Sequence, residues 1–167
     1  MWYYIFSLLT APGVVVHELG HAFFCWVAGI KIHKIKLFQF DKTTAGFVTH
    51  DEPHNFYQAI FISFGPLIAN SLLTLFLCAK LTAPYIDWHK ILYTWLAVAI
   101  GLHAIPSTGD AESLFRTSTS HLWRNPLKII GLPFVGVLYT LNFLKRIHFD
   151  FFYVIILFWL GRFYLKG

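Results

Sequence analysis

Charged residues are scarce in this 167-residue chain. Only 13% of its residues are Asp, Glu, Lys or Arg, 57% are hydrophobic and the mean hydropathy is +0.60. A water-soluble domain of this size needs far more charge to cover its surface. The composition therefore excludes an ordinary soluble protein and predicts an integral, multi-pass membrane protein.

Basic residues are missing from two long stretches. No Lys or Arg lies between residues 1 and 30 or between residues 43 and 79. The net charge of +5 is thus carried by other segments, where it sets orientation in a lipid bilayer and does not make a nucleic-acid surface. The first residues, Met-Trp-Tyr-Tyr, lack the basic region of a signal peptide, so we expect the first apolar segment to be retained.

Cysteine is also rare. Cys25 and Cys78 lie in apolar segments and have no C-x-x-C spacing. This placement favours lipid-facing or packing residues over a disulfide or a metal site.

Five apolar segments, at residues 2–30, 56–78, 91–105, 126–144 and 149–165, predict an all-α polytopic membrane protein with about five transmembrane helices. Residues 35–40 and 46–50 are rich in β-forming side chains and flank a turn-like stretch at 41–44. They predict a small β-hairpin after the first helix, with an amphipathic connector as the alternative. Because no repeat or linker divides the chain, we expect residues 1–167 to form one membrane-embedded domain.

The first apolar segment contains His-Glu-Leu-Gly-His at residues 17–21. Residues four apart lie on one face of a helix, so the imidazoles of His17 and His21 can bind one metal ion, for which zinc is the expected element. Glu18 lies beside the first ligand, where its carboxylate can take a proton from a water that the metal activates. Three titratable groups in an apolar helix are costly unless they are paired or bind metal, so the motif predicts a hydrolase.

A catalytic zinc needs at least one more protein ligand. Asp110 is the first candidate, because it follows Pro106 on backbone that is expected to be irregular and to turn back toward the metal. His103 and Glu112 are the alternatives. In the second segment, Asn70 follows Gly65-Pro66 and is explained either by a helix-to-helix hydrogen bond or by a role in the site.

The distribution of the 13 Lys and Arg residues predicts orientation. Four of them, Lys80, Lys90, Lys145 and Arg146, are expected at one side of the membrane. The other nine are expected with the hairpin, Asp110 and the C-terminus on the cytoplasmic side, so the metal should lie near that face. These nine are Lys31, Lys34, Lys36, Lys42, Arg116, Arg124, Lys128, Arg162 and Lys166.

Three features together resemble the site-2 protease family of intramembrane zinc metalloproteases: the motif at 17–21, Gly65-Pro66 with Asn70, and His103-Ala104-Ile105-Pro106 leading to Asp110. The resemblance covers about residues 10–115, the catalytic core, and leaves two accessory helices at about 126–165. It implies one Zn²⁺ and substrates that are membrane-spanning or membrane-associated proteins or peptides. The site residues it implies are His17, His21 and Asp110 as ligands, Glu18 as base, and Asn70 or His103 at the substrate or oxyanion.

The chain departs from the family's usual third motif, N-x-x-P-x-x-x-x-D-G. His103 stands at the asparagine position, one residue fewer separates Pro106 from Asp110, and Ala111 replaces the glycine. We expect no PDZ-like or nucleotide-sensing domain, so substrate choice should come from the membrane core or from a regulatory membrane partner. No nucleic-acid partner is expected.

The predicted function is an intramembrane zinc metalloendopeptidase. The alternatives are a membrane metal-binding or transport protein and a non-proteolytic relative. A transporter would spread polar residues across the bilayer, whereas the later apolar segments carry almost none. For the protease, we expect an unwound substrate segment to pair with a free strand edge at residues 35–40, since peptide groups freed from a helix need new partners in a water-poor place.

Overall fold

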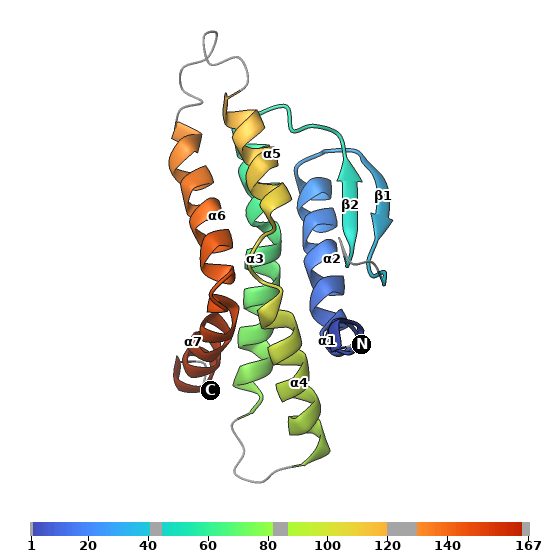
Figure 1. Cartoon of the computed structure of the whole chain (residues 1–167), viewed down its shortest axis with the longest axis vertical. Coiled ribbons are helices and arrows are strands. Elements are labelled where there is room, and N and C mark those ends of the chain that lie inside the picture. The colour runs from blue at the N-terminus through green and yellow to red at the C-terminus, as the bar shows by residue number, and fades with distance from the viewer. Residues whose placement is uncertain (1, 41–44, 82–86, 120–129, 165–167) are drawn as a thin grey trace.

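The computed structural model describes residues 2–40, 45–81, 87–119 and 130–164. In this part of the chain, helices dominate and one small antiparallel sheet is present, as the sequence predicts (Figure 1). The predicted turn at 41–44 and the start of the segment 126–144 lie outside the described residues. The elements are α1 (Trp2–Leu9), α2 (Ala11–Val27), β1 (Ile32–Lys36), β2 (Phe47–His50), α3 (Phe56–Ala79), α4 (Trp88–Leu102), α5 (Thr108–Thr119), α6 (Leu132–Lys145) and α7 (Phe149–Tyr164).

The first apolar segment holds two helices, α1 and α2. Helix α2 restarts after Thr10 with Pro12 in its first turn, where the missing N–H of proline costs nothing. It ends before Gly29, whose φ of 69° is a left-handed conformation that suits glycine. The metal motif therefore lies in the middle of a separate helix, α2.

The hairpin forms where the sequence predicts it, although β1 begins three residues earlier than expected. Its register pairs Ile35 with Val48 and Lys36 with Phe47. At its base, His33 Nε2 lies 2.6 Å from Asp51 Oδ1, and this hydrogen bond holds the pKa of the Asp51 carboxyl below its usual range. The two strands lie beside α2, with β2 between α2 and β1 (Figure 1).

Helix α3 is the centre of the fold, since it contacts α2, α4, α5 and α7. It begins at a capping box formed by Asn55 and Gln58, and it continues through Pro66. Among the described helices, α3 is the one that is long and apolar enough to cross a membrane by length and composition. The five predicted spans therefore remain a prediction.

Helix α5 was not predicted. Its sequence, Thr108–Thr119, is too polar to count as an apolar segment, and only one side of it is buried. On that side, Ala111 and Leu114 pack against Ala59 of α3 and Leu138 of α6. The residues after Pro106, which the sequence assigned to irregular backbone, thus continue as a helix.

Helix α7 runs toward the end of the molecule opposite the hairpin. Gln58 in the first turn of α3 donates to the carbonyl oxygen of Ala28, so the hairpin lies near the start of α3. Gly161 instead lies against Cys78, close to the other end of α3. Arg162 is therefore at the opposite end from the hairpin, which corrects the side assigned to it by the sequence. The order of helices explains the error, because α6 and α7 follow one another in the same direction (Figure 1).

Small residues let α2 approach its neighbours closely. A Cβ on Gly20 would lie 3.1 Å from the Cα of Pro66, and a Cβ on Gly13 would overlap the carbonyl oxygen of Ala99. Cys25 and Cys78 are free and buried, in agreement with packing roles. The helix that carries the metal motif is thus pressed against both α3 and α4.

We expect Gly13→Ala to destabilise the protein by about 1–3 kcal/mol, because the added methyl group has no space between α2 and α4. Gly136→Ala is the matched control, since a Cβ at this position in α6 meets nothing within 4 Å. Thermal unfolding in detergent micelles measures both. Equal melting temperatures for the two variants would contradict the close contact.

Candidate metal centre

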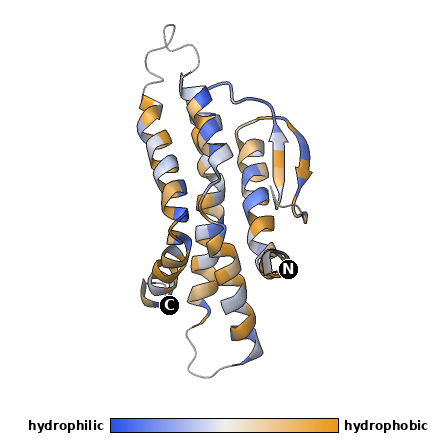
Figure 2. Ribbon diagram, viewed as in Figure 1, coloured by the Kyte–Doolittle hydropathy of each residue, from blue (hydrophilic) through white to orange (hydrophobic). Residues whose placement is uncertain are grey.

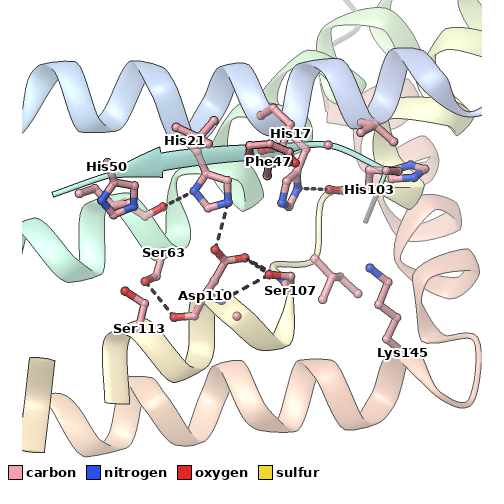
Figure 3. A pocket seen from close by; sticks show the side chains of 18 residues that line it. His17, His21, Phe47, His50, Ser63, His103, Ser107, Asp110, Ser113 and Lys145 are labelled. Carbon is pink, nitrogen blue, oxygen red and sulfur yellow. Dashed lines mark hydrogen bonds and ion pairs between the residues drawn. The ribbon is translucent and has the colours of Figure 1, made fainter. Parts of the chain in front are cut away.

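Three side chains that the sequence named as ligands converge. Helix α2 presents His17 and His21, and α5 presents Asp110; one ligand atom from each lies within 4.8 Å of the others. His21 Nε2 is 3.1 Å from Asp110 Oδ1 (Figure 3). Two ligand atoms of a tetrahedral zinc site are about 3.3 Å apart, so this pair already has suitable spacing.

Both imidazoles are oriented by backbone carbonyl groups. His17 Nδ1 donates to the carbonyl oxygen of His103 at 2.7 Å, and His21 Nδ1 donates to that of Ile62 at 3.1 Å. With the proton on Nδ1, each Nε2 offers its lone pair to the cluster. This is the arrangement that supports histidine ligands in metal sites, and it is the evidence in the structure that the residues fit a metal.

Asp110 is held by the start of its own helix. The backbone N–H and the hydroxyl group of Ser107 donate to Asp110 Oδ2 at 2.6 and 2.7 Å, while the Asp110 N–H donates to Ser107 Oγ at 3.3 Å. These reciprocal bonds have the form of a capping box. One carboxylate oxygen is thereby occupied and the other faces His21. Asp110 thus stands in the first helical turn of α5, which corrects the expectation of irregular backbone.

A cavity of about 520 Å³ opens beside the cluster. Glu18 lines it and is only 7% exposed, yet it is not one of the three clustered ligands. A Cβ on Gly46 would lie 2.8 Å from Glu18 Cγ, so the chain just before β2 passes directly over the glutamate. Glu18 can therefore act on a molecule in the cavity without binding the metal.

Of the other candidates for third ligand, neither joins the cluster. The His103 ring lines the cavity, but its Nδ1 donates to the carbonyl oxygen of Ala99 at 3.1 Å. Glu112 lines a smaller, adjoining cavity with Glu52 and Arg116. Of the three candidates for third ligand, Asp110 is thus the one that the structure places with the two motif histidines.

Asn70 lies away from the cavity. It is fully buried, and its Nδ2 donates to the carbonyl oxygens of Gly13 at 3.2 Å and Ile100 at 3.0 Å. The side chain therefore joins α3 to α2 and α4. This matches the helix-to-helix hydrogen bond weighed in the sequence, and the structure does not place Asn70 at a substrate.

The hairpin meets the cavity through its second strand. Gly46, Phe47, Val48 and His50 line the cavity, whereas residues 35–40 do not. The predicted substrate edge at 35–40 thus does not border the cavity, and β2 is the strand that does. The sequence could not decide this, because the order of β2 and β1 beside α2 depends on how the hairpin folds back.

The sequence analysis also missed several cavity residues. His50 Nδ1 donates to the Asp51 carbonyl oxygen at 2.7 Å, which orients its ring at the cavity wall. Ser107 is the N-cap of α5, Ser113 lies within α5, and Lys145 is at the end of α6. None of them has a spacing motif that links it to the histidines. Their proximity to the metal cluster arises only from helix packing.

Comparison with models of known protein families gives a match to this chain. Residues 1–107 match the family described as Peptidase M50B-like, which confirms the relationship to site-2 proteases predicted from the motifs. Neither a curated protein nor a solved structure matches the chain with significance. The family match covers well over half of the chain and stops just before Asp110, so the third ligand is assigned by geometry.

We expect Asp110→Ala to weaken zinc binding by more than about 100-fold, because it removes a ligand and not merely a neighbour of one. His103→Ala should retain zinc, since the carbonyl group that orients His17 belongs to the backbone. Glu112→Ala is a matched control on the same helix. Elemental analysis and chelator competition on the purified variants measure the effect; zinc retained by Asp110→Ala and lost from His103→Ala would show that the assignment is wrong.

Proposed function

Because the chain belongs to the Peptidase M50B-like family, we propose that it is an intramembrane zinc metalloendopeptidase that hydrolyses peptide bonds of membrane-spanning or membrane-associated proteins. The observation that carries the proposal is the convergence of His17, His21 and Asp110, with Glu18 on the wall of the same cavity. Two imidazoles and one carboxylate are the donor types of a catalytic zinc site, which keeps a further position for water or substrate.

Zinc held by these three residues would supply Lewis-acid chemistry, polarising a carbonyl group and making water acidic. Glu18 is the proposed general base, which takes the proton from the attacking water and later delivers it to the leaving amine. Its position on the cavity wall supports this role. His103 also lines the cavity and is the proposed donor to the carbonyl oxygen of the substrate. Because its Nδ1 proton is held by the Ala99 carbonyl oxygen, it can donate from Nε2 only as a doubly protonated ring. The buried position of Asn70 does not support such a role for Asn70.

The outer surface supports a membrane location. Large apolar side chains, including Phe23, Trp26, Leu72, Phe143 and Phe152, are more than half exposed. Hydrophobic residues are spread along all of the large helices of the bundle (Figure 2). Apolar surface of this extent is rare on monomeric soluble proteins and suits contact with lipid.

We propose that several helices cross the bilayer and that the hairpin end faces the cytoplasm. Ile62, which orients His21, is the seventh residue of α3, so the cluster lies about two turns inside the start of this helix. Basic residues support the orientation. Among the described residues, Lys31, Lys34, Lys36 and Arg116 belong to the hairpin end, and Lys80, Lys90 and Arg162 to the other. Lys145 lines the metal cavity together with Asp110, which corrects the side that the sequence assigned to Lys145 and the adjacent Arg146.

We expect Glu18→Gln to keep zinc and fold but to slow hydrolysis by about 10²–10⁴-fold, because an amide cannot accept the proton from water. Single-span reporter proteins in proteoliposomes, analysed by mass spectrometry for cleavage products, give the rate, and elemental analysis gives the zinc content. Glu52→Gln, which lies outside the metal cavity, is the control.

Two results would contradict this role. Full activity of Glu18→Gln would remove Glu18 as the base. Loss of zinc together with activity would make the glutamate a part of the metal site. Absence of cleavage by the wild-type, zinc-loaded protein across the reporter set would favour the non-proteolytic alternative.

We further propose that an unwound substrate segment pairs with β2. The sheet has two strands, so β2 has one edge that β1 does not occupy, and β2 lines the cavity. Peptide groups released from a substrate helix need hydrogen-bond partners where water is scarce. A strand edge supplies them without requiring a particular side-chain sequence.

We expect proline at Phe47 or Val48, whichever of the two directs its N–H away from β1, to slow cleavage by about 10-fold, because the loss of that backbone hydrogen bond to substrate costs about 1–2 kcal/mol. Phe38→Pro is the comparison, since residue 38 does not line the cavity. Cleavage rates should be compared at equal zinc content. Unchanged rates across the β2 variants would exclude the strand-addition model of substrate binding.

A further inference from the structure

One basic side chain other than histidine is found among the residues that line the metal cavity. Lys145 is the last residue of α6, and it is only partly exposed. Figure 3 shows its amine end directed toward the side of the cavity where His103 lies. The family match ends at residue 107, so Lys145 belongs to a part of the chain that the match does not cover.

The position of α6 is fixed relative to the metal ligands. Asn142 Nδ2 donates to the carbonyl oxygen of Ser107 at 3.2 Å, and Ser107 is the residue that holds Asp110. Lys145 follows Asn142 by three residues and therefore lies on the same side of α6. Ser107, which lies between α4 and α5, thus contacts both the third ligand and the helix that carries Lys145.

The ammonium group has no anionic partner in contact. Within the described residues, the ammonium group of Lys145 makes no hydrogen bond and no ion pair shorter than 4.0 Å. Its neighbours of opposite charge are Asp150 and Asp110. Asp110 is already engaged by His21 and Ser107, and Asp150 Oδ1 is buried without a hydrogen-bond partner.

The charges around the cavity leave the ammonium group of Lys145 without a direct partner. The other groups that face Lys145 are the imidazoles of His17 and His103. A divalent ion on two neutral imidazoles and one carboxylate would leave one positive charge, which Glu18 balances. Asp150 balances the ammonium charge of Lys145 in number, but the two make no ion pair shorter than 4.0 Å, so the ammonium group still lacks a direct partner.

We propose that Lys145 binds a carboxylate group of the substrate next to the scissile bond and so makes the enzyme selective for acidic substrates. This inference rests on the proposed metalloprotease function and names the substrate class of that site. The carboxylate comes either from an acidic side chain or from a free C-terminus. In both cases the contact is an ion pair with the ammonium group, made in a cavity where water is limited.

The proposal is tested by calorimetry, which measures the affinity of the zinc-loaded protein for peptidyl hydroxamates. The hydroxamate group of these peptides binds zinc. Four peptides differ only at the last residue, which is Gln-amide, Glu-amide, Lys-amide or Gln with a free carboxyl group. Wild type should bind one or both acidic peptides about 10- to 100-fold more tightly than the Gln-amide. Tighter binding of the Glu-amide peptide alone identifies an acidic side chain as the group that Lys145 binds. Tighter binding of the peptide with the free carboxyl group alone identifies a C-terminus.

Three variants separate charge recognition from structural damage. Lys145→Gln should abolish the acidic preference, and Lys145→Glu should reverse it in favour of Lys-amide. Damage to the fold would weaken the binding of all four peptides and would not reverse their order of affinity. Arg146→Gln removes a charge from the next residue, which is exposed and does not line the cavity, and should leave the preference unchanged.

The inference is overturned if wild type binds the acidic and neutral peptides equally, or if the preference survives in Lys145→Gln. Tight, unselective binding of hydroxamates would still support the metal site, so the proposed function would stand. If no hydroxamate binds the zinc-loaded protein, the metalloprotease proposal fails and this inference fails with it.

Discussion

One missing backbone hydrogen bond is the feature on which the metal cluster depends. In an uninterrupted helix, the N–H of Ser107 would donate to the carbonyl oxygen of His103. The break between α4 and α5 separates these groups, and each serves a ligand instead. The carbonyl oxygen accepts from His17, and the N–H donates to Asp110. Pro106, which has no N–H, makes the interruption tolerable in the chain at this point.

The position of α2 is the second requirement, because it carries two ligands and the proposed base. Asn70 fastens α2 to α3 and α4 through Gly13 and Ile100, and Gly20 permits the close crossing at Pro66. A buried amide that makes these bonds is specific in direction, unlike apolar packing. Asn70 thus holds α2 in position relative to α3 and α4, although it does not line the cavity.

The C-terminal helices take part in the site more than their sequences suggest. They were expected to be accessory and free of chemistry, and α6 instead provides Asn142 and Lys145. The cause is the apolar contact between α5 and α6, in which Leu114 and Leu138 are fully buried. Packing of these two leucines brings a lysine that lies 35 residues after Asp110 to the same cavity.

The sequence by itself determined what depends on short spacing: His17 and His21 on one helical face, Glu18 beside them, a helical chain and a hairpin after the motif. Only the tertiary structure decided what depends on distant contacts. It selected Asp110 over His103 and Glu112, set β2 over the cavity and placed Asn70 outside it. The physical reason is that helical and strand periodicity fix the direction of neighbouring side chains, whereas the meeting of remote segments is set by how whole helices pack, break and reverse direction.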